Sequence, residues 1–336
     1  MKKAVIKREN IENNINVIKS IYKNLNIIGV IKANAYGHGA KDISKLLYEF
    51  GIKTVAVATF EEAKELLSLN IDQDVIILGP SSREDLLSID TPRLIQTITS
   101  ESYYHEIGDL KVRKQVNVNT GMNRFGLDRD NALLTKLINN HEIEGIYTHF
   151  LNNEQHDLTT KQIEKLRNNN DALIVHTSIT DPDILKQNNI KNIRAGLALY
   201  GYEKFEWAHK LKPILSLYAK IINIMEVPAG ASISYNATYV AKKNIVVGTV
   251  AIGYADGLPF NYKNGSVFYK EKLCRILGRI TMDYIMVDLS EVDSELYDYV
   301  EIFGENISAT KIAEQSDTIV YEILTRIGKR VVKKIV

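Results

Sequence analysis

Short apolar runs rich in valine and isoleucine recur through the first two-thirds of the chain, and a more polar stretch follows each run. Runs of four to seven residues are typical of buried strands, because helices are usually longer. Between them, segments such as 60–69 and 159–168 place apolar residues at helical spacing. The predicted strands are 27–33, 54–59, 75–79, 95–99, 115–119, 145–149, 173–176 and 192–195.

A strand followed by a helix, eight times within about 200 residues, predicts an α/β fold of the (β/α)8 TIM-type barrel class. The alternative is an open, doubly wound sheet built from the same units. We favour the barrel because an open sheet rarely needs eight such units.

The pattern changes after residue 215, where apolar runs follow one another with only turns between them. Glycines at 230, 257, 265 and 278 supply the turn chemistry. The chain is therefore expected to divide into a barrel over 1–215 and a mostly β C-terminal domain over 216–336, with residues 1–6 as candidates to pack with the second. Its predicted strands are 216–225, 232–240, 244–252, 273–277, 284–289 and 299–303, followed by helices 310–316 and 317–327.

Composition narrows the function classes. Lysine and arginine (42) nearly cancel aspartate and glutamate (41) among the 336 residues, which argues against a dedicated nucleic-acid surface. Cys274 is the one cysteine, so an intrachain disulfide cannot form and a reducing compartment is expected. Charged residues interrupt the N-terminus, and no apolar run reaches the ~18 residues of a membrane span. We expect a cytoplasmic chain with no nucleic-acid or membrane partner.

Reactive groups of barrels collect where the strands end, and the first predicted strand runs into Lys32. A lysine there is costly unless its ammonium is paired, neutralised or able to reach solvent along the barrel mouth. A desolvated amine of lowered pKa is what a Schiff-base lysine requires. The Gly196-Leu197 turn, with hydroxyls at Ser178 and Thr180, fits a barrel phosphate site. Together these features indicate pyridoxal 5'-phosphate as the cofactor.

The stretch VIKANAYGHG, residues 30–39, closely resembles the pyridoxal-phosphate attachment motif of alanine racemases. The resemblance continues in order along nearly the whole chain. The further matching segments are 119–126, 147–150, 194–201, 233–239, 251–257 and 278–283. Each segment alone is modest evidence, but seven in the right order and spacing are strong.

The resemblance implies a racemase that interconverts L- and D-alanine, with D-alanine supplied to cell-wall peptidoglycan. Racemisation removes the Cα proton on one face and returns one on the other, so two bases on opposite faces are needed. The resemblance assigns these roles to Lys32 and Tyr235, with Arg194 and His149 providing positive surroundings for the tyrosine. It also implies a head-to-tail homodimer in which each β domain completes its partner's site.

The resemblance further implies the contacts of cofactor and substrate. Arg194 faces the pyridine nitrogen, where an arginine can only donate and so leaves the ring neutral. The remaining assignments place His149 against the ring; Tyr36, Thr180, Gly196 and Leu197 on the phosphate; Arg124 on the phenolic oxygen and the substrate carboxylate; and Met282, Tyr254 and Asp283 near the substrate.

The chain departs from the family pattern at three places. Asn117 stands where many relatives have a lysine that buttresses the motif arginine, so Arg124 must be held another way, for example with a bound anion such as chloride. Relatives commonly show Asn-Ser where this chain has Ile179-Thr180, which leaves Ser178 as a competitor for the phosphate. Lys329 replaces an aromatic residue near the substrate, which leaves serine or a larger amino acid open as the substrate.

Other functions remain as alternatives. Related barrel enzymes decarboxylate basic amino acids, but they carry an acidic residue where this chain has Arg194. A non-catalytic pyridoxal-phosphate-binding protein resembles only the barrel and lacks a segment like that of Tyr235. A metal site built from His38, His149 and His176 is conceivable on residue type, but no ligand spacing supports it, and we expect no metal.

Overall fold

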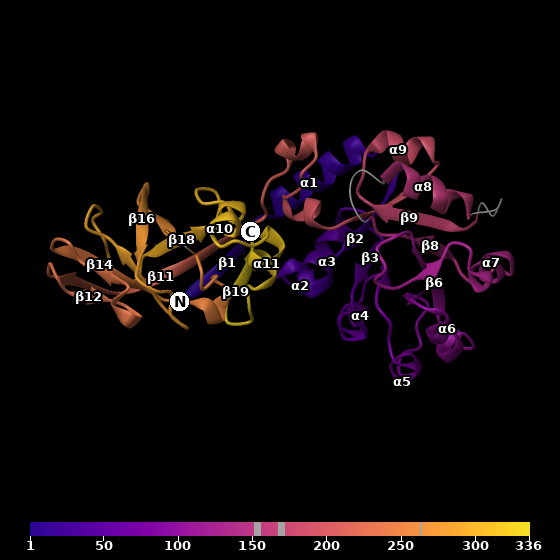
Figure 1. The fold of residues 1–336 in the computed structure, drawn as a ribbon, viewed down its shortest axis with the longest axis horizontal. Helices are drawn as coiled ribbons and strands as arrows, with labels where there is room; N and C mark the ends of the chain where they lie inside the picture. The colour runs from indigo at the N-terminus through magenta and orange to yellow at the C-terminus, as the bar shows by residue number, and fades with distance from the viewer. Residues whose placement is uncertain (151–155, 167–171, 263) are drawn as a thin grey trace. The chain divides into compact units, whose positions relative to one another are not determined.

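The computed structural model describes residues 1–150, 156–166, 172–262 and 264–336 (Figure 1). Its contacts divide the chain into two compact units. Met1–Ile11, Tyr36–Gly39 and Tyr200–Val336 form the first, called the β unit here, and Glu12–Ala35 with Ala40–Leu199 form the second, called the barrel unit. No helix among the described residues combines the length and the apolar character that crossing a membrane requires.

The barrel unit closes on itself. Among the described residues, eight parallel strands pair in the circular order β5-β4-β3-β2-β10-β9-β8-β6, and the pairing of β5 with β6 completes the ring. This confirms the predicted barrel and rules out the open sheet. The strands are β2 (Asn26–Val30), β3 (Thr54–Val57), β4 (Asp74–Ile77), β5 (Leu94–Ile98), β6 (Arg113–Asn119), β8 (Gly145–Tyr147), β9 (Ile174–Ser178) and β10 (Asn192–Ala195), and the short β7 (Leu127–Asp128) pairs with β6.

Helices surround this ring (Figure 1) and cover the outer face of the strands, which explains why both faces of β5 are buried. Most helices begin at a side-chain cap, such as Thr59 before α4 and Ser100 before α6, which accepts a backbone N–H of the first turn. The predicted helix 159–168 belongs to α8, and its last two residues, 167–168, lie outside the described residues. The helices are α1 (Arg8–Ile21), α3 (Ala40–Glu49), α4 (Phe60–Leu67), α5 (Arg83–Leu87), α6 (Glu101–Ile107), α7 (Ala132–Asn139), α8 (His156–Lys165) and α9 (Pro182–Gln187).

The β unit holds one large sheet of strand order β14-β17-β16-β15-β18-β11-β1-β19. The long strand β11 also pairs with β14, so the sheet curls back on itself. This confirms the predicted mostly β C-terminal domain. Its strands are β1 (Lys2–Ile6), β11 (Leu215–Val227), β14 (Ile245–Val250), β15 (Ser266–Tyr269), β16 (Lys272–Leu277), β17 (Ile285–Asp288), β18 (Tyr299–Phe303) and β19 (Val332–Ile335), with helices α10 (Ala309–Gln315) and α11 (Val320–Thr325).

The N-terminal strand lies inside this sheet. β1 pairs antiparallel with β11, where Ala4 faces Leu217, and parallel with β19, where Ala4 faces Lys333. Ala4 and Ile6 are buried in the core of the unit. The first and last strands of the described chain are therefore neighbours in space.

The predicted strand 232–240 was wrong as a single element. β12 (Ser232–Ile233) and β13 (Tyr239–Val240) pair antiparallel as a hairpin around the short turn Tyr235–Ala237. The reason is local, because Ser234, Asn236 and Ala237 have left-handed backbone angles that no strand contains. The turn places Tyr235 at the tip of the hairpin instead of within a sheet.

Candidate active site

The ends of the barrel strands bring most of the predicted residues of this unit to one rim. Lys32 follows β2, Arg124 follows β6, His149 follows β8, and Arg194 lies in β10. Because the strands are parallel and paired in a closed ring, their carboxyl ends share one face of the barrel. Four side chains that are far apart in the sequence are thereby gathered at one site.

Arg194 is the best anchored of these side chains. The residue is 5% exposed, and its guanidinium lies over the ring of Tyr147, 4.5 Å from the centroid. Its Nη2 donates to the carbonyl oxygen of Thr148 at 2.7 Å and to Ser178 Oγ at 3.2 Å. Its Nη1 pairs with His176 Nδ1 at 2.9 Å. A planar donor held on several sides has one orientation, so the direction of its N–H groups is fixed.

The contact with Arg194 determines the state of His176. An arginine can only donate, so Nδ1 of His176 must accept, and the ring proton lies on Nε2. That nitrogen donates to Gln115 Oε1 at 2.8 Å, and the Gln115 amide donates in turn to Thr97 Oγ1 at 3.0 Å. Burial, together with the charge of Arg194, keeps the pKa of His176 well below its ordinary value. His176 is therefore a neutral support for Arg194, with no ring nitrogen left for a metal.

His149 joins the same network through a hydroxyl. Ser178 Oγ lies 3.0 Å from His149 Nδ1, and Ser178 also accepts from Arg194. Burial first, and then the charges of Arg194, Arg124 and Lys32, lower the pKa of His149 to about 4. The ring remains accessible to solvent, but three cations act on it as well as desolvation, so the neutral form is strongly favoured. Arg194 and His149 are thus linked through Ser178.

Lys32 is half-buried at the same rim. Burial is the largest cause that lowers the pKa of its amine, and the charges of Arg124 and Arg194 lower it further. The carboxylate of Glu62 acts in the opposite direction. The outcome is an amine that becomes neutral at lower pH than an exposed lysine, which is the condition for nucleophilic attack on a carbonyl carbon.

The backbone after Lys32 is strained. The predicted first strand, 27–33, was too long at this end, because β2 stops at Val30 and a short left-handed turn, called α2 (Lys32–Tyr36), begins. Ala33, Asn34, Ala35 and Tyr36 have φ angles of 51°, 55°, 54° and 51°. Each such residue costs about 1–2 kcal/mol, so four of them store roughly 4–8 kcal/mol. A turn of this kind persists only where its surroundings hold it.

The loop that carries Arg124 has internal hydrogen bonds. The side chain of Asn119 closes that loop, because its Oδ1 accepts the backbone N–H groups of Gly121 and Asn123 at 3.2 and 3.1 Å. Gly126 has a φ of 122°, and a Cβ there would lie 2.5 Å from Asn117 Oδ1, so the loop packs directly on Asn117. Many relatives have a lysine at position 117 that supports the arginine. Here the contact of Gly126 with Asn117 positions the loop instead.

The predicted phosphate residues fall into two groups. Thr180 is fully buried, and its carbonyl oxygen accepts from Tyr22, while Gly196 and Leu197 follow β10 in the barrel unit. Tyr36 belongs to the β unit, where its ring lies 5.0 Å from that of Tyr200, centroid to centroid. Ser178, the competitor of Thr180, has its hydroxyl engaged by His149 and Arg194.

The predicted substrate residues of the β unit are close to one another. The backbone N–H of Tyr254 donates to the carbonyl oxygen of Thr281 at 3.1 Å, and that of Ala255 donates to the carbonyl oxygen of Met282 at 3.0 Å. Asp283 accepts from Arg330 Nη2 at 2.6 Å. Tyr235 stands apart at the hairpin tip with 67% of its surface exposed, and Tyr254 and Met282 are also exposed.

Asp256 anchors this segment of the β unit through two ion pairs and a hydrogen bond. Its carboxylate is fully buried, with Lys2 Nζ at 2.6 Å and Arg330 Nε at 3.2 Å. It also accepts the backbone N–H of Gly253 at 3.1 Å. The buried carboxylate of Asp256 therefore connects strand β1, the turn that contains Tyr254, and Arg330, which also pairs with Asp283.

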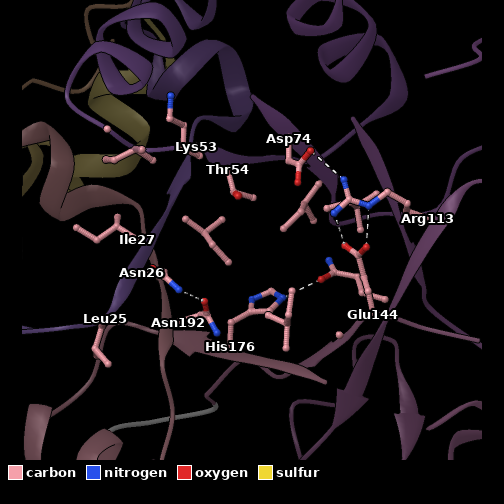
Figure 2. A pocket seen from close by; sticks show the side chains of 18 of the residues that line it. Leu25, Asn26, Ile27, Lys53, Thr54, Asp74, Arg113, Glu144, His176 and Asn192 are labelled. Carbon is pink, nitrogen blue, oxygen red and sulfur yellow. Dashed lines mark hydrogen bonds and ion pairs between the residues drawn. The ribbon is translucent and has the colours of Figure 1, made fainter. Parts of the chain in front are cut away.

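A cavity of about 400 Å³ lies at the opposite end of the barrel from Lys32 (Figure 2). The first residues of the strands line it, among them Asn26, Thr54 and Asp74. Arg113 is neutralised there by Asp74 at 2.9 Å and by Glu144 at 2.7 Å, as Figure 2 shows. Reactive groups of barrels lie at the other face, so we assign the chemistry to the Lys32 end.

Sequence reasoning named His176 only as a possible metal ligand and did not consider Glu62. The signal that could have identified the role of His176 is the pairing of strands. Strands β9 and β10 are neighbours, and Asn192 lies opposite His176. Glu62 resembles an ordinary helix-capping residue, three positions after Thr59. Among the described residues, no group of three or more His, Cys, Asp or Glu side chains could hold a metal ion.

Comparisons with known proteins cover both units. The family model described as alanine racemase, N-terminal domain, matches residues 6–204, and the model of the C-terminal domain matches 214–335. An alanine racemase of Halothermothrix orenii is 36% identical, over 95% of this chain and 92% of its own. That of Aquifex aeolicus is 31% identical over 98% of both chains.

Solved structures agree with these sequence matches. An alanine racemase of Clostridium difficile superposes with a TM-score of 0.90 at 30% identity, over 100% of this chain and 95% of its own. The alanine racemase of Bartonella henselae, solved with covalently bound pyridoxal phosphate, has a TM-score of 0.88 at 27% identity, over 100% of this chain and 99% of its own.

Proposed function

This chain belongs to the alanine racemase family, and on that basis we propose how its residues carry out the reaction. It is a pyridoxal-phosphate-dependent isomerase that interconverts L- and D-alanine. The roles of single residues, the assembly and the cellular task are the parts that we propose.

The observation that carries the proposal is the surroundings of Lys32. Its half-buried amine, of lowered pKa, shares a strand-end rim with Arg124 and Arg194. A rim with three cationic side chains suits a cofactor that bears a phosphate and a substrate that bears a carboxylate. Pyridoxal phosphate, when bound there, supplies an electron sink that weakens the Cα–H bond of the amino acid. Lys32 is the residue that would hold it.

Arg194 would donate to the pyridine nitrogen. Because His176 and Thr148 fix its guanidinium, the donated N–H has a set direction. An arginine does not give up its proton, so the ring nitrogen stays unprotonated and the electron sink stays moderate. A moderate sink disfavours side reactions such as transamination, which suits an enzyme that only moves a proton.

Two side chains then move the proton at Cα. Lys32 takes or returns it on one face, and the phenol of Tyr235 does the same on the other. The hairpin tip leaves Tyr235 exposed, together with Tyr254 and Met282, which supports a head-to-tail homodimer in which these residues enter the barrel mouth of a second copy.

The other contacts follow from chemistry. Arg124 would bind the substrate carboxylate with its forked donors and contact the phenolic oxygen of the cofactor. The backbone N–H of Met282, with Tyr254 and Asp283 beside it, would complete the substrate pocket. Thr180, together with Tyr36 and the backbone of Gly196 and Leu197, is the proposed phosphate ligand, while the hydroxyl of Ser178 contacts His149 and Arg194.

We propose a cytoplasmic enzyme that supplies D-alanine for cell-wall peptidoglycan. The single free cysteine, Cys274, supports a reducing compartment. Deletion of the gene in its host should create a requirement for D-alanine, and growth without added D-alanine would contradict this task.

The reaction is tested by deuterium exchange at Cα. Wild-type protein in D₂O should exchange the Cα proton of L- and D-alanine faster than that of serine or lysine. Lys32→Ala and Tyr235→Phe should each lower racemisation by a factor of about 10² to 10⁴. Release of carbon dioxide, or a preference for serine or lysine, would refute the assignment. The comparison of alanine, serine and lysine also tests Lys329, because a cation there would either hold the phosphate and leave the preference for alanine intact, or widen or repolarise the substrate pocket and change that preference.

Mixing the two inactive variants tests the shared site. In a mixed dimer, one site would carry both substitutions and the other would be intact. After random reassociation, activity should return to about one quarter of the wild-type value. Activity that stays at the level of the single variants would show that Lys32 and Tyr235 of one chain serve the same site, or that no dimer forms.

A further inference from the structure

One carboxylate ties together the ends of two adjacent barrel strands. Glu62 Oε1 accepts the backbone N–H of Ala33 at 2.6 Å, and Glu62 Oε2 accepts that of Ala58 at 2.8 Å. Ala33 comes just after Lys32, beyond the end of β2, and Ala58 directly follows β3. Strands β2 and β3 are hydrogen-bonded neighbours, with Val30 opposite Ala56. Glu62 therefore closes this part of the barrel rim beside the lysine.

This arrangement differs from an ordinary helix cap. Thr59 caps α4 by accepting the N–H of Glu62, and the two residues have capping-box spacing. In a capping box the glutamate would turn back to the N–H of the cap residue itself. Here both oxygens are used elsewhere, and one of them reaches a residue 29 positions earlier in the chain.

The contact with Ala33 falls where the backbone needs support. Ala33 is the first residue of the turn with left-handed backbone angles, and its N–H belongs to the peptide that links it to Lys32. Ala35 N–H to Ile31 oxygen, at 2.8 Å, and Ala40 N–H to Asn34 Oδ1, at 2.9 Å, also support the turn. Of these three hydrogen bonds, only that of Glu62 carries a charge, and charge-assisted bonds to carboxylates are roughly twice as strong as neutral ones.

We propose that Glu62 is a positioning residue for Lys32, one that fixes the direction in which the lysine leaves the strand and supplies the negative charge that balances the cations around it. The proposal rests on the proposed role of Lys32 as the cofactor-binding lysine and proton carrier. Glu62 itself need not touch the cofactor or the substrate.

The charges around Lys32 support the second half of the proposal. Arg124 and Arg194 lower the pKa of the amine, His149 shares the same positive surroundings, and Glu62 is the one carboxylate among the described residues found to raise it. A proton carrier must both take and return a proton, so its pKa should not fall too far below the working pH. Removing the charge of Glu62 would leave the two arginines unopposed.

Three variants of the full-length chain separate the two effects. Glu62→Gln removes the charge and one of the two acceptors, whereas Glu62→Asp keeps the charge and both acceptors on a shorter side chain. Glu61→Gln is the matched control, because it removes the same charge from an exposed neighbour in the first turn of the same helix.

The first measurement is amide hydrogen exchange of cofactor-free protein, read by mass spectrometry on peptides covering 28–39. Glu62→Gln should speed exchange at Ala33 by about tenfold or more, the loss expected for one hydrogen bond to a charged group. Glu62→Asp should restore part of the protection, and Glu61→Gln should match the wild type.

The second measurement is the pH dependence of Lys32 labelling by pyridoxal phosphate, trapped with borohydride and quantified on the Lys32 peptide. The labelling midpoint should shift to lower pH in Glu62→Gln and stay near that of the wild type in Glu62→Asp and Glu61→Gln. A merely structural role would lower the extent of labelling without moving this midpoint.

The outcomes are distinct. Wild-type exchange and an unchanged midpoint in Glu62→Gln would overturn the positioning role while leaving the function of Lys32 intact. If Glu62→Gln does not fold, Glu62→Asp decides: a midpoint near that of the wild type supports the proposal, and one shifted to lower pH overturns it. Failure of the wild-type Lys32 peptide to be labelled at any pH would instead refute the proposed function.

Discussion

Replacing Ala33 by glycine should stabilise the protein, although glycine usually destabilises a helical segment. Ala33 has φ 51° and ψ 50°, a conformation that costs an L-residue about 1–2 kcal/mol and costs glycine little. Glycine loses about 0.4–1 kcal/mol through the greater freedom of its unfolded state. The side chain is exposed, so little buried methyl surface is lost. The difference leaves a gain of about 0.8 kcal/mol, within a range of roughly 0 to 1.6.

The assay is thermal unfolding of the cofactor-free chain followed by circular dichroism. A gain of this size should raise the midpoint by roughly 1–3 °C. Ala33→Gly should also bind pyridoxal phosphate more weakly, because the freed backbone no longer fixes the direction of Lys32. Stability and cofactor affinity would then change in opposite directions, as expected where strain serves a function.

Ala132→Gly is the matched control. Ala132 is also exposed, but it lies in the right-handed helix α7 of the same unit, so its replacement should destabilise by up to about 1 kcal/mol. If Ala33→Gly destabilised the protein as much as this control, the left-handed turn would not store the strain that its backbone angles indicate.

Three further results are expected. Because burial and the charge of Arg194 hold the folded-state pKa of His176 well below that of an exposed histidine, the unfolded chain binds the extra proton, and stability should fall as pH drops below about 6.5. In urea unfolding, His176→Gln should remove about 1 kcal/mol of the loss between pH 7.5 and 5.5, and an unchanged pH dependence would contradict this reasoning. Asp256→Asn should destabilise the β unit by about 3 kcal/mol in the same assay, against less than about 1 for Glu305→Gln at an exposed ion pair, and equal effects would contradict the buried role of Asp256. Gly253→Ala would place a Cβ 2.3 Å from two carbonyl oxygens of the 281–282 segment and should lower kcat/KM at least about tenfold, so unchanged steady-state kinetics would exclude a positioning role for this contact.

Local patterns predicted much of the fold. The last barrel strand, 192–195, and the strand 299–303 have the predicted bounds. The partners of β1 could not be predicted in this way, because its register with β11 depends on residues more than 200 positions away. The left-handed turn after Lys32 could not be predicted either, since alanine rarely adopts that conformation.

The site was predictable to a similar depth. The position of Lys32 after a buried strand indicates its chemistry, and the strand order then brings Arg194 to the same rim. The support of Arg194 by His176 depends on which strands are neighbours, which a single strand does not reveal. Tyr235 was identified only through family resemblance, because nothing in its local pattern distinguishes it from other tyrosines.

The place of β1 in the sheet also has a consequence for biosynthesis. Strand β1 (Lys2–Ile6) is made first, yet its partner β11 begins at Leu215 and β19 comes later still. At about 5–20 residues per second, the ribosome needs roughly 10–40 s to supply β11. By the end of that interval the barrel residues up to 199 have been made, whereas β1 has kept its backbone donors and acceptors unpaired throughout. The nascent chain should therefore need protection over β1, and a bulky fusion just before β1 should hinder the last step of folding more than the first.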